Sequence, residues 1–227
     1  AFVTVCFLVV GLLAGTTFSD DAPTFFRGIN LNGPAVEIDG RRWEAGDSRG
    51  VMAEGLSAFE NQSVRLIPAT DDARAKMIRS SRYARDGKAR LRVTDLPVGT
   101  CSVYLYVWED NDPQTFDVLL NGQRVVEKFN SGNGGQWARL GPWVVEVTDG
   151  TIDLQAIGGH ANLSGLEIWR GKLTDKDNPL PGFTPTVAKS SLEADVAVLL
   201  ARNCLECHNG SDRKGGLDLT RRERALT

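Results

Sequence analysis

This sequence has few cysteines and histidines and no large excess of charge of either sign. Its 227 residues include four Cys and two His, and 26 Lys and Arg side chains stand against 29 Asp and Glu, for a net charge of −3. Four cysteines are too few for a disulfide framework in a chain of this length. A nearly balanced charge provides no overall field that would gather nucleic acid, so we expect no nucleic-acid partner.

The chain also has little that could cross a membrane. The apolar segment of residues 2–13 carries no charge but is too short to span a bilayer comfortably. Small residues, Thr17 and Ser19 among them, and then acids follow it, which is typical of an export signal with its cleavage site. We therefore interpret residues 1–19 as a signal peptide. We expect an exported protein, located in the periplasm, at the cell surface or outside the cell, with no stable membrane span after cleavage. The alternative interpretation of the apolar segment is a buried core strand.

One stretch, from Arg74 to Arg92, is rich in basic residues, although Asp86 lies within it and Asp71 and Asp72 precede it. Mixed charge of this kind is typical of a solvated face. An anion-binding site is the alternative.

Glycine is abundant, with 24 residues, and between residues 25 and 171 short apolar-polar alternations are separated by turn residues. Asn121-Gly122 between two apolar segments is the strongest hairpin signal in the chain. We predict a mainly β domain over residues 25–171, a β-sandwich or jelly roll. The expected strands cover residues 29–33, 36–40, 64–66, 89–93, 101–107, 116–120, 125–129, 144–147, 152–156 and 166–169.

Single residues in this region also carry expectations. Cys101 lies in an alternating segment and is predicted to be a small buried side chain. Trp143 and Trp169 fall in predicted strands and are expected in the core. Trp137 is flanked by Gly and Gln residues and is expected to be exposed.

Residues 172–189 contain several prolines and charges and few large apolar residues, which is typical of a linker. Ser190, with Glu193 three residues later, forms a capping box, and an apolar face predicts a helix to about residue 202. A second unit is therefore expected over residues 190–227.

The pentapeptide Cys204-Leu-Glu-Cys207-His208 has the spacing of a c-type haem attachment motif. Two thiols three positions apart can each bond one vinyl group while the adjacent imidazole reaches the iron. We predict covalent haem c on Cys204 and Cys207, with His208 as axial ligand. A zinc site would need two more ligands, a thioredoxin-type site would need a βαβ context, and a structural disulfide is a further alternative.

Residues 204–227, with His208-Asn-Gly and Lys214-Gly-Gly-Leu-Asp-Leu, resemble the start of a planctomycete-type cytochrome c domain. The resemblance implies a large, exported, multidomain protein that exchanges electrons with a redox partner protein. The second axial ligand is expected beyond residue 227 or to be absent.

Residues 25–171 resemble malectin-like carbohydrate-binding β-sandwiches. The motifs are Ile29-Asn-Leu-Asn-Gly, Val103-Tyr-Leu-Tyr-Val-Trp-Glu, Phe116-Asp-Val-Leu-Leu-Asn-Gly and Leu163-Ser-Gly-Leu-Glu-Ile. The resemblance places a ligand-binding loop after the strand that ends in Glu109, and it assigns Tyr83 an aromatic contact. It implies a glycan as partner.

Sugar sites combine an exposed aromatic ring with polar groups held on loops, because a pyranose has an apolar face and a rim of hydroxyls. The candidate ligand residues are Tyr83, Trp108, Glu109, Asp110, Asn111 and Asp112. They predict weak binding of a neutral or acidic glycan. Calcium bound to the acidic loop is the alternative, and a core position is the alternative for Trp108.

Taken together, the motifs predict an exported c-type haem protein for electron transfer that carries a carbohydrate-binding-like module. The alternatives are a β domain that serves as a structural adaptor without binding sugar, or a redox enzyme that uses the haem as a relay. No catalytic constellation can be identified from spacing, so enzymatic activity is left open.

Overall fold

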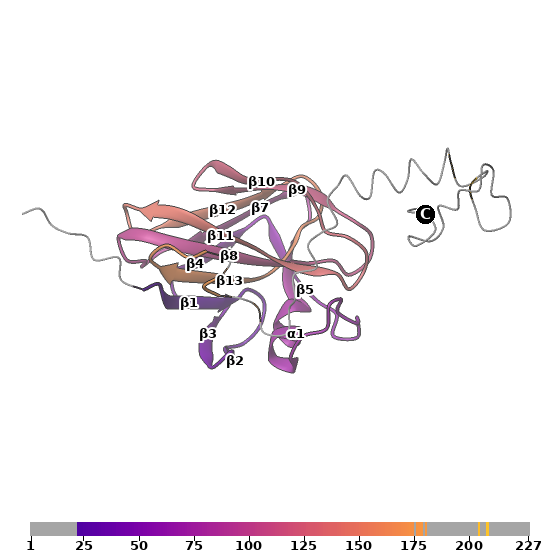
Figure 1. The fold of residues 1–227 in the computed structure, drawn as a ribbon, viewed down its shortest axis with the longest axis horizontal. Helices are drawn as coiled ribbons and strands as arrows, with labels where there is room; N and C mark the ends of the chain where they lie inside the picture. Colours follow the sequence, from indigo (N-terminus) through magenta and orange to yellow (C-terminus); the bar gives the residue numbers. More distant parts are fainter. Residues whose placement is uncertain (1–21, 175, 179, 181–203, 205–207, 209–227) are drawn as a thin grey trace, which may run out of the picture. The chain divides into compact units, whose positions relative to one another are not determined.

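The computed structural model describes residues 22–174, 176–178, 180, 204 and 208. Strands dominate the described residues, in two sheets that Figure 1 shows stacked on each other, with the single helix α1 (Asp72–Ile78) to one side. No helix among the described residues is long and apolar enough to cross a membrane. The predicted mainly β two-sheet sandwich is confirmed.

The larger sheet has eight strands. Its main path runs through β11 (Trp137–Val147), β8 (Gly99–Trp108), β13 (Asn162–Arg170), β1 (Thr24–Asn30), β3 (Arg41–Ala45) and β2 (Val36–Ile38). A hairpin of β5 (Leu56–Glu60) and β6 (Ser80–Ala84) joins this path through pairing of β6 with β13.

The smaller sheet has five strands, in the order β10 (Gln123–Asn130), β9 (Thr115–Leu120), β12 (Ile152–Ile157), β7 (Lys88–Val93) and β4 (Val51–Glu54). The β9–β10 hairpin turns at Asn121-Gly122, where both residues have positive φ (49° and 79°), as a tight hairpin turn of the primed type requires. The predicted hairpin is confirmed.

An aliphatic core fills the space between the sheets. From β8 it receives Cys101, Val103 and Leu105, and from the smaller sheet Leu91 and Val118. The prediction of a buried Cys101 is confirmed, and burial raises the pKa of its thiol. Trp143 packs partly buried against this core, as expected.

The opposite face of the larger sheet, called the outer face below, is also buried. Figure 1 shows β2, β3 and α1 on this side, away from the smaller sheet. The indole of Trp43 lies against the glycines of two central strands: a Cβ at Gly28 would lie 2.6 Å from Trp43 Cδ2, and one at Gly165 would lie 2.9 Å from Trp43 Cζ3. Both positions therefore need glycine.

Trp169 lies on this outer face, buried as expected. Trp137 was expected to be exposed, and that prediction is wrong. Its ring is buried and stacks on Tyr106, and its Nε1–H donates a hydrogen bond of 2.7 Å to the Pro68 carbonyl. A polar indole N–H that finds a backbone acceptor makes such burial favourable.

The basic stretch does not form a uniformly solvated face. Asp71 caps α1, accepting a hydrogen bond of 2.9 Å from the Arg74 N–H. The Arg74 side chain is 1% exposed and forms ion pairs with Asp39 and Asp71. These intramolecular partners neutralise the guanidinium, so it is not available to an external anion.

Other sequence expectations also differ from the structure. Residues 64–66 form no strand, and the adjacent Ile67 forms only an isolated bridge with Gln136. The structure adds β3, β4, β5 and β6, which were not expected.

Part of the expected linker packs on the β domain. The Ser102 hydroxyl donates to the Gly171 carbonyl (2.8 Å) and accepts from the Leu173 N–H (2.9 Å). Leu173 packs against Tyr104, and Asn178 donates to Glu167 at 3.2 Å. The packed chain thus continues past residue 171 to Asn178.

Candidate functional site

A cavity of about 300 Å³ opens among the ends of β5, β6 and β8 and the loops that lead into β9 and β13. We call it the tip cavity. It is lined by Phe59, Tyr83, Glu109, Asp110, Asn111, Gln114, His160 and Asn162. Four of the six predicted ligand residues are therefore brought together here: Tyr83, Glu109, Asp110 and Asn111.

One wall of the tip cavity is aromatic. The pairing of β5 with β6 places Phe59 opposite Ser81 and Tyr83 opposite Ser57, so both rings project from the same face of the hairpin. The rings meet edge to face, with centroids 6.2 Å apart and an interplanar angle of 80°. Both rings are only partly buried.

Trp108 supports this wall without lining it. Its ring is 1% exposed and stacks on Phe59 with centroids 6.2 Å apart. The structure therefore places Trp108 in the buried layer of the outer face. Its role at the site is to hold the Phe59 ring.

Glu109 shapes the loop. Its side chain is buried, and Oε1 accepts the backbone N–H groups of Asp110 (3.1 Å) and Asn111 (3.2 Å). Oε2 accepts the Ser131 hydroxyl at 2.5 Å. Because these bonds occupy the carboxylate, Glu109 positions the loop. Direct contact with a ligand in the tip cavity is then left to the neighbouring residues.

Asp110 is the carboxylate that faces the cavity. Its Oδ1 accepts a hydrogen bond of 2.9 Å from Asn162 Nδ2, and no hydrogen bond within the described residues reaches its Oδ2. The Asn111 Oδ1 accepts a hydrogen bond of 2.7 Å from the Asp112 N–H, so the amide nitrogen of Asn111 points away from this backbone group. Asp112 is exposed and does not line the cavity.

Four lining residues were not among the predicted ligand residues: Phe59, Gln114, His160 and Asn162. Gln114 Oε1 accepts the His160 N–H at 3.0 Å, which joins the two loops. His160 Nδ1 lies 3.0 Å from the Ala84 carbonyl, an acceptor only, so this bond requires a proton on Nδ1. In the neutral ring, Nε2 then remains as an acceptor.

The described residues contain no group of three or more His, Cys, Asp or Glu side chains that could hold a metal ion. In the acidic loop, both carboxylate oxygens of Glu109 accept hydrogen bonds from other residues, and Asp112 does not line the cavity. Of the carboxylates in this loop, Asp110 is the one that lines the cavity with an oxygen, Oδ2, that accepts no hydrogen bond within the described residues.

Only two residues of the predicted haem motif are described. The His208 N–H donates a hydrogen bond of 2.9 Å to the Cys204 carbonyl. The Cys204 thiol is free, and His208 Nδ1 is buried without a hydrogen-bond partner among the described residues. A thiol and an imidazole are the types of group that hold a c-type haem. Cys207, the predicted signal peptide and the remainder of residues 190–227 lie outside the described residues.

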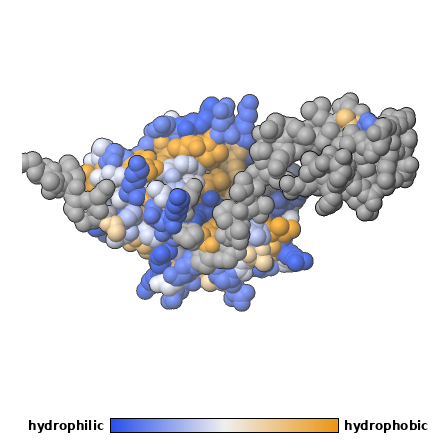
Figure 2. Space-filling view, in the orientation of Figure 1, coloured by the Kyte–Doolittle hydropathy of each residue, from blue (hydrophilic) through white to orange (hydrophobic). Residues whose placement is uncertain are grey.

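On the face seen in Figure 2, hydrophilic residues line the upper and lower edges of the β domain and hydrophobic residues form small patches between them. The exposed large hydrophobic residues of the described chain are Met52, Ile67, Val98, Val144 and Ile157. They are scattered over different segments, so none of them marks a large apolar binding surface.

No protein-family model and no curated protein matches this chain. Among solved structures, it is similar to a plant receptor-like kinase, ANX2 (TM-score 0.54, 16% identity), over 67% of this chain and 49% of that one. The ANX1 ectodomain from Arabidopsis thaliana (0.53, 14%) is matched over 67% and 50%.

A third similar structure is a β-glucuronidase from Bacteroides uniformis (TM-score 0.51, 16% identity), matched over 65% of this chain and 18% of that one. This chain thus spans about half the length of the two receptor chains and less than a fifth of the enzyme. The likeness concerns the fold alone: the described residues between 22 and 178 form a two-sheet β-sandwich similar to a part of each of these structures.

Proposed function

We propose that the β domain is a carbohydrate-binding module whose tip cavity holds one ring of a neutral glycan. The observation that carries the proposal is the pairing of an aromatic wall, Phe59 and Tyr83, with a carboxylate and amides on the facing loops. The apolar face of a pyranose stacks on aromatic rings, while its hydroxyls need acceptors and donors held in place.

Each group has a distinct task in this proposal. Tyr83 and Phe59 receive the apolar face of the sugar. Asp110 Oδ2 accepts hydroxyl hydrogens, and the amides of Asn111 and Gln114 serve hydroxyls at the rim. Because Asp110 brings a negative charge into the cavity, a neutral sugar fits better than an acidic one.

The expected affinity is low. One stacked sugar ring and a few hydrogen bonds each contribute about 0.5–1.5 kcal/mol, which corresponds to a Kd of roughly millimolar order. A longer glycan would bind more tightly only if it made contacts beyond the cavity.

NMR titration of the full chain with a panel of neutral mono- and disaccharides tests the proposal. We expect saturable shifts at Tyr83 and in residues 110–114, and Tyr83→Ala should weaken binding at least fivefold. Gln123→Ala is the control, because Gln123 is exposed and follows the β9–β10 turn. If no sugar caused saturable shifts and calcium did cause shifts, the glycan proposal would be contradicted, and calcium would be the ligand of this loop.

We further propose that Cys204 and Cys207 carry haem c and that His208 is its axial ligand, which would make the longer protein an electron-transfer protein. The support is the pentapeptide and the hydrogen bond that joins the His208 N–H to the Cys204 carbonyl. When bound, the haem supplies one-electron redox chemistry. The two thiols tether it, and the imidazole fixes its position.

Expression with export and haem-attachment machinery, followed by a pyridine haemochrome spectrum of the denatured protein, tests this assignment. We expect a c-type signal that the double variant Cys204→Ser and Cys207→Ser abolishes. Cys101→Ser is the matched control and should keep the signal, since Cys101 lies in the core of the sandwich. A spectrum without covalent haem would contradict the assignment.

Export itself is part of the same proposal, because c-type haem is attached outside the cytoplasm. N-terminal sequencing of the exported protein should find a start near Asp20. An unprocessed N-terminus would contradict it.

A further inference from the structure

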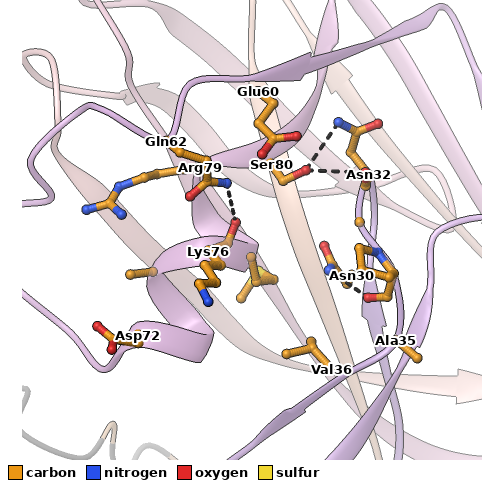
Figure 3. A pocket seen from close by; sticks show the side chains of 14 residues that line it. Asn30, Asn32, Ala35, Val36, Glu60, Gln62, Asp72, Lys76, Arg79 and Ser80 are labelled. Atoms are coloured by element: carbon orange, nitrogen blue, oxygen red, sulfur yellow. Dashed lines mark hydrogen bonds between the residues drawn. The ribbon is translucent and has the colours of Figure 1, made fainter.

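A second and larger cavity, of about 570 Å³, lies between α1 and the turn that joins β1 to β2 (Figure 3). We call it the helix cavity. Glu60 of β5 and Ser80 of β6 close one side of it. It is separate from the tip cavity, because Glu60 and Ser80 point to the face of the β5–β6 hairpin opposite to that of Phe59 and Tyr83.

Asn30 is the unusual group in this cavity. Its side chain is 4% exposed, its Nδ2 donates to the Pro34 carbonyl at 2.9 Å, and its Oδ1 has no hydrogen-bond partner among the described residues. Figure 3 shows the amide oxygen turned toward the open space. A buried acceptor without a donor is costly, so a ligand that donates there gains free energy.

The orientation of Asn30 is fixed by its surroundings. Gly33 is packed so closely that a Cβ on it would lie 2.2 Å from Asn30 Nδ2. The hydrogen bond to the Pro34 carbonyl holds the amide nitrogen, and the oxygen lies on the cavity side (Figure 3). By contrast, Asn32 and Ser80 bond each other (3.3 Å) and need no ligand.

The remaining lining is apolar inside and charged at the rim. Met77 and Ala75 come from α1, and Val36 comes from β2. Glu60 lies above the cavity in Figure 3, and Lys76 lies to its left, on α1. Neither of them forms an ion pair with another described residue.

The rim also carries Asp72 and Arg79, one of each charge, so the rim as a whole is balanced. Balanced charge disfavours a purely cationic or purely anionic ligand. No aromatic side chain is among the described residues that line the cavity, so it lacks the stacking surface that a sugar ring uses.

We infer that the helix cavity binds a free α-amino acid with an apolar side chain. Its ammonium group donates to Asn30 Oδ1 and pairs with Glu60, and its carboxylate pairs with Lys76. Its side chain packs against Met77, Ala75 and Val36. This assignment is independent of the glycan proposal, because it uses different residues and a different ligand chemistry.

Calorimetric titration of the full chain with L-leucine tests the inference. N-acetyl-leucine lacks the ammonium group and leucinamide lacks the carboxylate, and each should bind at least tenfold more weakly than leucine. Glucose should not displace leucine. No saturable leucine binding, binding of either derivative as tightly as leucine, or displacement of leucine by glucose would each overturn the inference.

Substitutions of residues that line the helix cavity test whether leucine binds there. Glu60→Gln and Lys76→Met should each weaken leucine binding at least fivefold, and both residues are exposed, so the fold should be kept. Glu37→Gln and Lys88→Met are matched controls on exposed positions outside the cavity and should have no effect. Asn30 is buried and its variants can unfold the turn, so Ala35→Trp, at an exposed lining position, is used to fill the cavity and should abolish binding. Undiminished binding by Ala35→Trp would overturn the assignment.

Discussion

The two faces of the eight-stranded sheet are both buried, yet they are built from different chemistry. Along β8 the residues that face the smaller sheet are aliphatic, such as Val103 and Leu105, whereas the outer face receives Tyr104, Tyr106 and Trp108. The inward positions of β8 carry no hydroxyl, amide or charged side chain. The outer face is covered by short elements, and its aromatic rings carry polar atoms that need partners.

Glu167 meets this need for two of the outer rings, those of Tyr106 and Trp169. This buried carboxylate accepts the Tyr106 hydroxyl at 2.6 Å, the Trp169 indole N–H at 3.0 Å and Asn178 Nδ2 at 3.2 Å. The guanidinium of Arg139 lies 3.9 Å away. The inner face thus supplies stability. The outer layer borders both cavities, because it also contains Trp108, which lies behind Phe59, and Met77 of α1.

The largest effect is expected on the inner face. Leu105→Ala removes a fully buried aliphatic side chain and leaves a cavity between the sheets, so the free energy of unfolding should fall by about 2–5 kcal/mol. Denaturant unfolding measures the loss. A loss below about 1 kcal/mol would mean that the inner face does not carry the stability.

A smaller effect is expected on the outer face. Tyr106→Phe keeps the ring but removes the hydroxyl that donates to Glu167, which should cost about 1–3 kcal/mol. The same unfolding experiment applies. If Tyr106→Phe were as stable as the original chain, the Glu167 network would not need this donor.

The pH dependence separates the faces further. Burial and then the charge of Glu167 raise the pKa of Tyr106 well above its usual value near 10, and burial raises that of Cys101 above about 9. At higher pH the unfolded chain releases these protons while the folded chain keeps them, so stability should fall as pH rises from about 9.

Unfolding measured between pH 8 and pH 11 checks this prediction. Cys101→Val should remove the part of the loss that begins near pH 9, and Tyr106→Phe the part that begins near pH 10. An unchanged pH profile in both variants would assign the loss to other groups.

Local signals in the sequence are enough to predict the inner face of the sandwich. The alternation of residues 101–107 and the Asn121-Gly122 turn specify a sandwich, because both are local signals. The outer cover has no such signal: β3 contains Arg41, Arg42 and Glu44 around a single buried Trp43. Its burial depends on packing against Gly28 and Gly165, which are far away in the sequence.

The same limit applies to the site. The acidic loop could be identified, but the sequence could not distinguish the carboxylate of Glu109, which holds the loop, from that of Asp110, which faces the cavity. Phe59 lies on a strand with no clear alternation and was therefore missed. Gln114, His160 and Asn162 reach the cavity only through the pairing of distant segments.

The most direct test of the central claim is a titration that compares two carboxylates of one loop. Asp110 lines the tip cavity and Asp112 does not. With a neutral sugar that binds the original chain, Asp110→Ala should weaken binding at least fivefold, and Asp112→Ala should leave the Kd unchanged. Equal weakening by both substitutions, or none by Asp110→Ala, would contradict the assignment of the tip cavity as the glycan site.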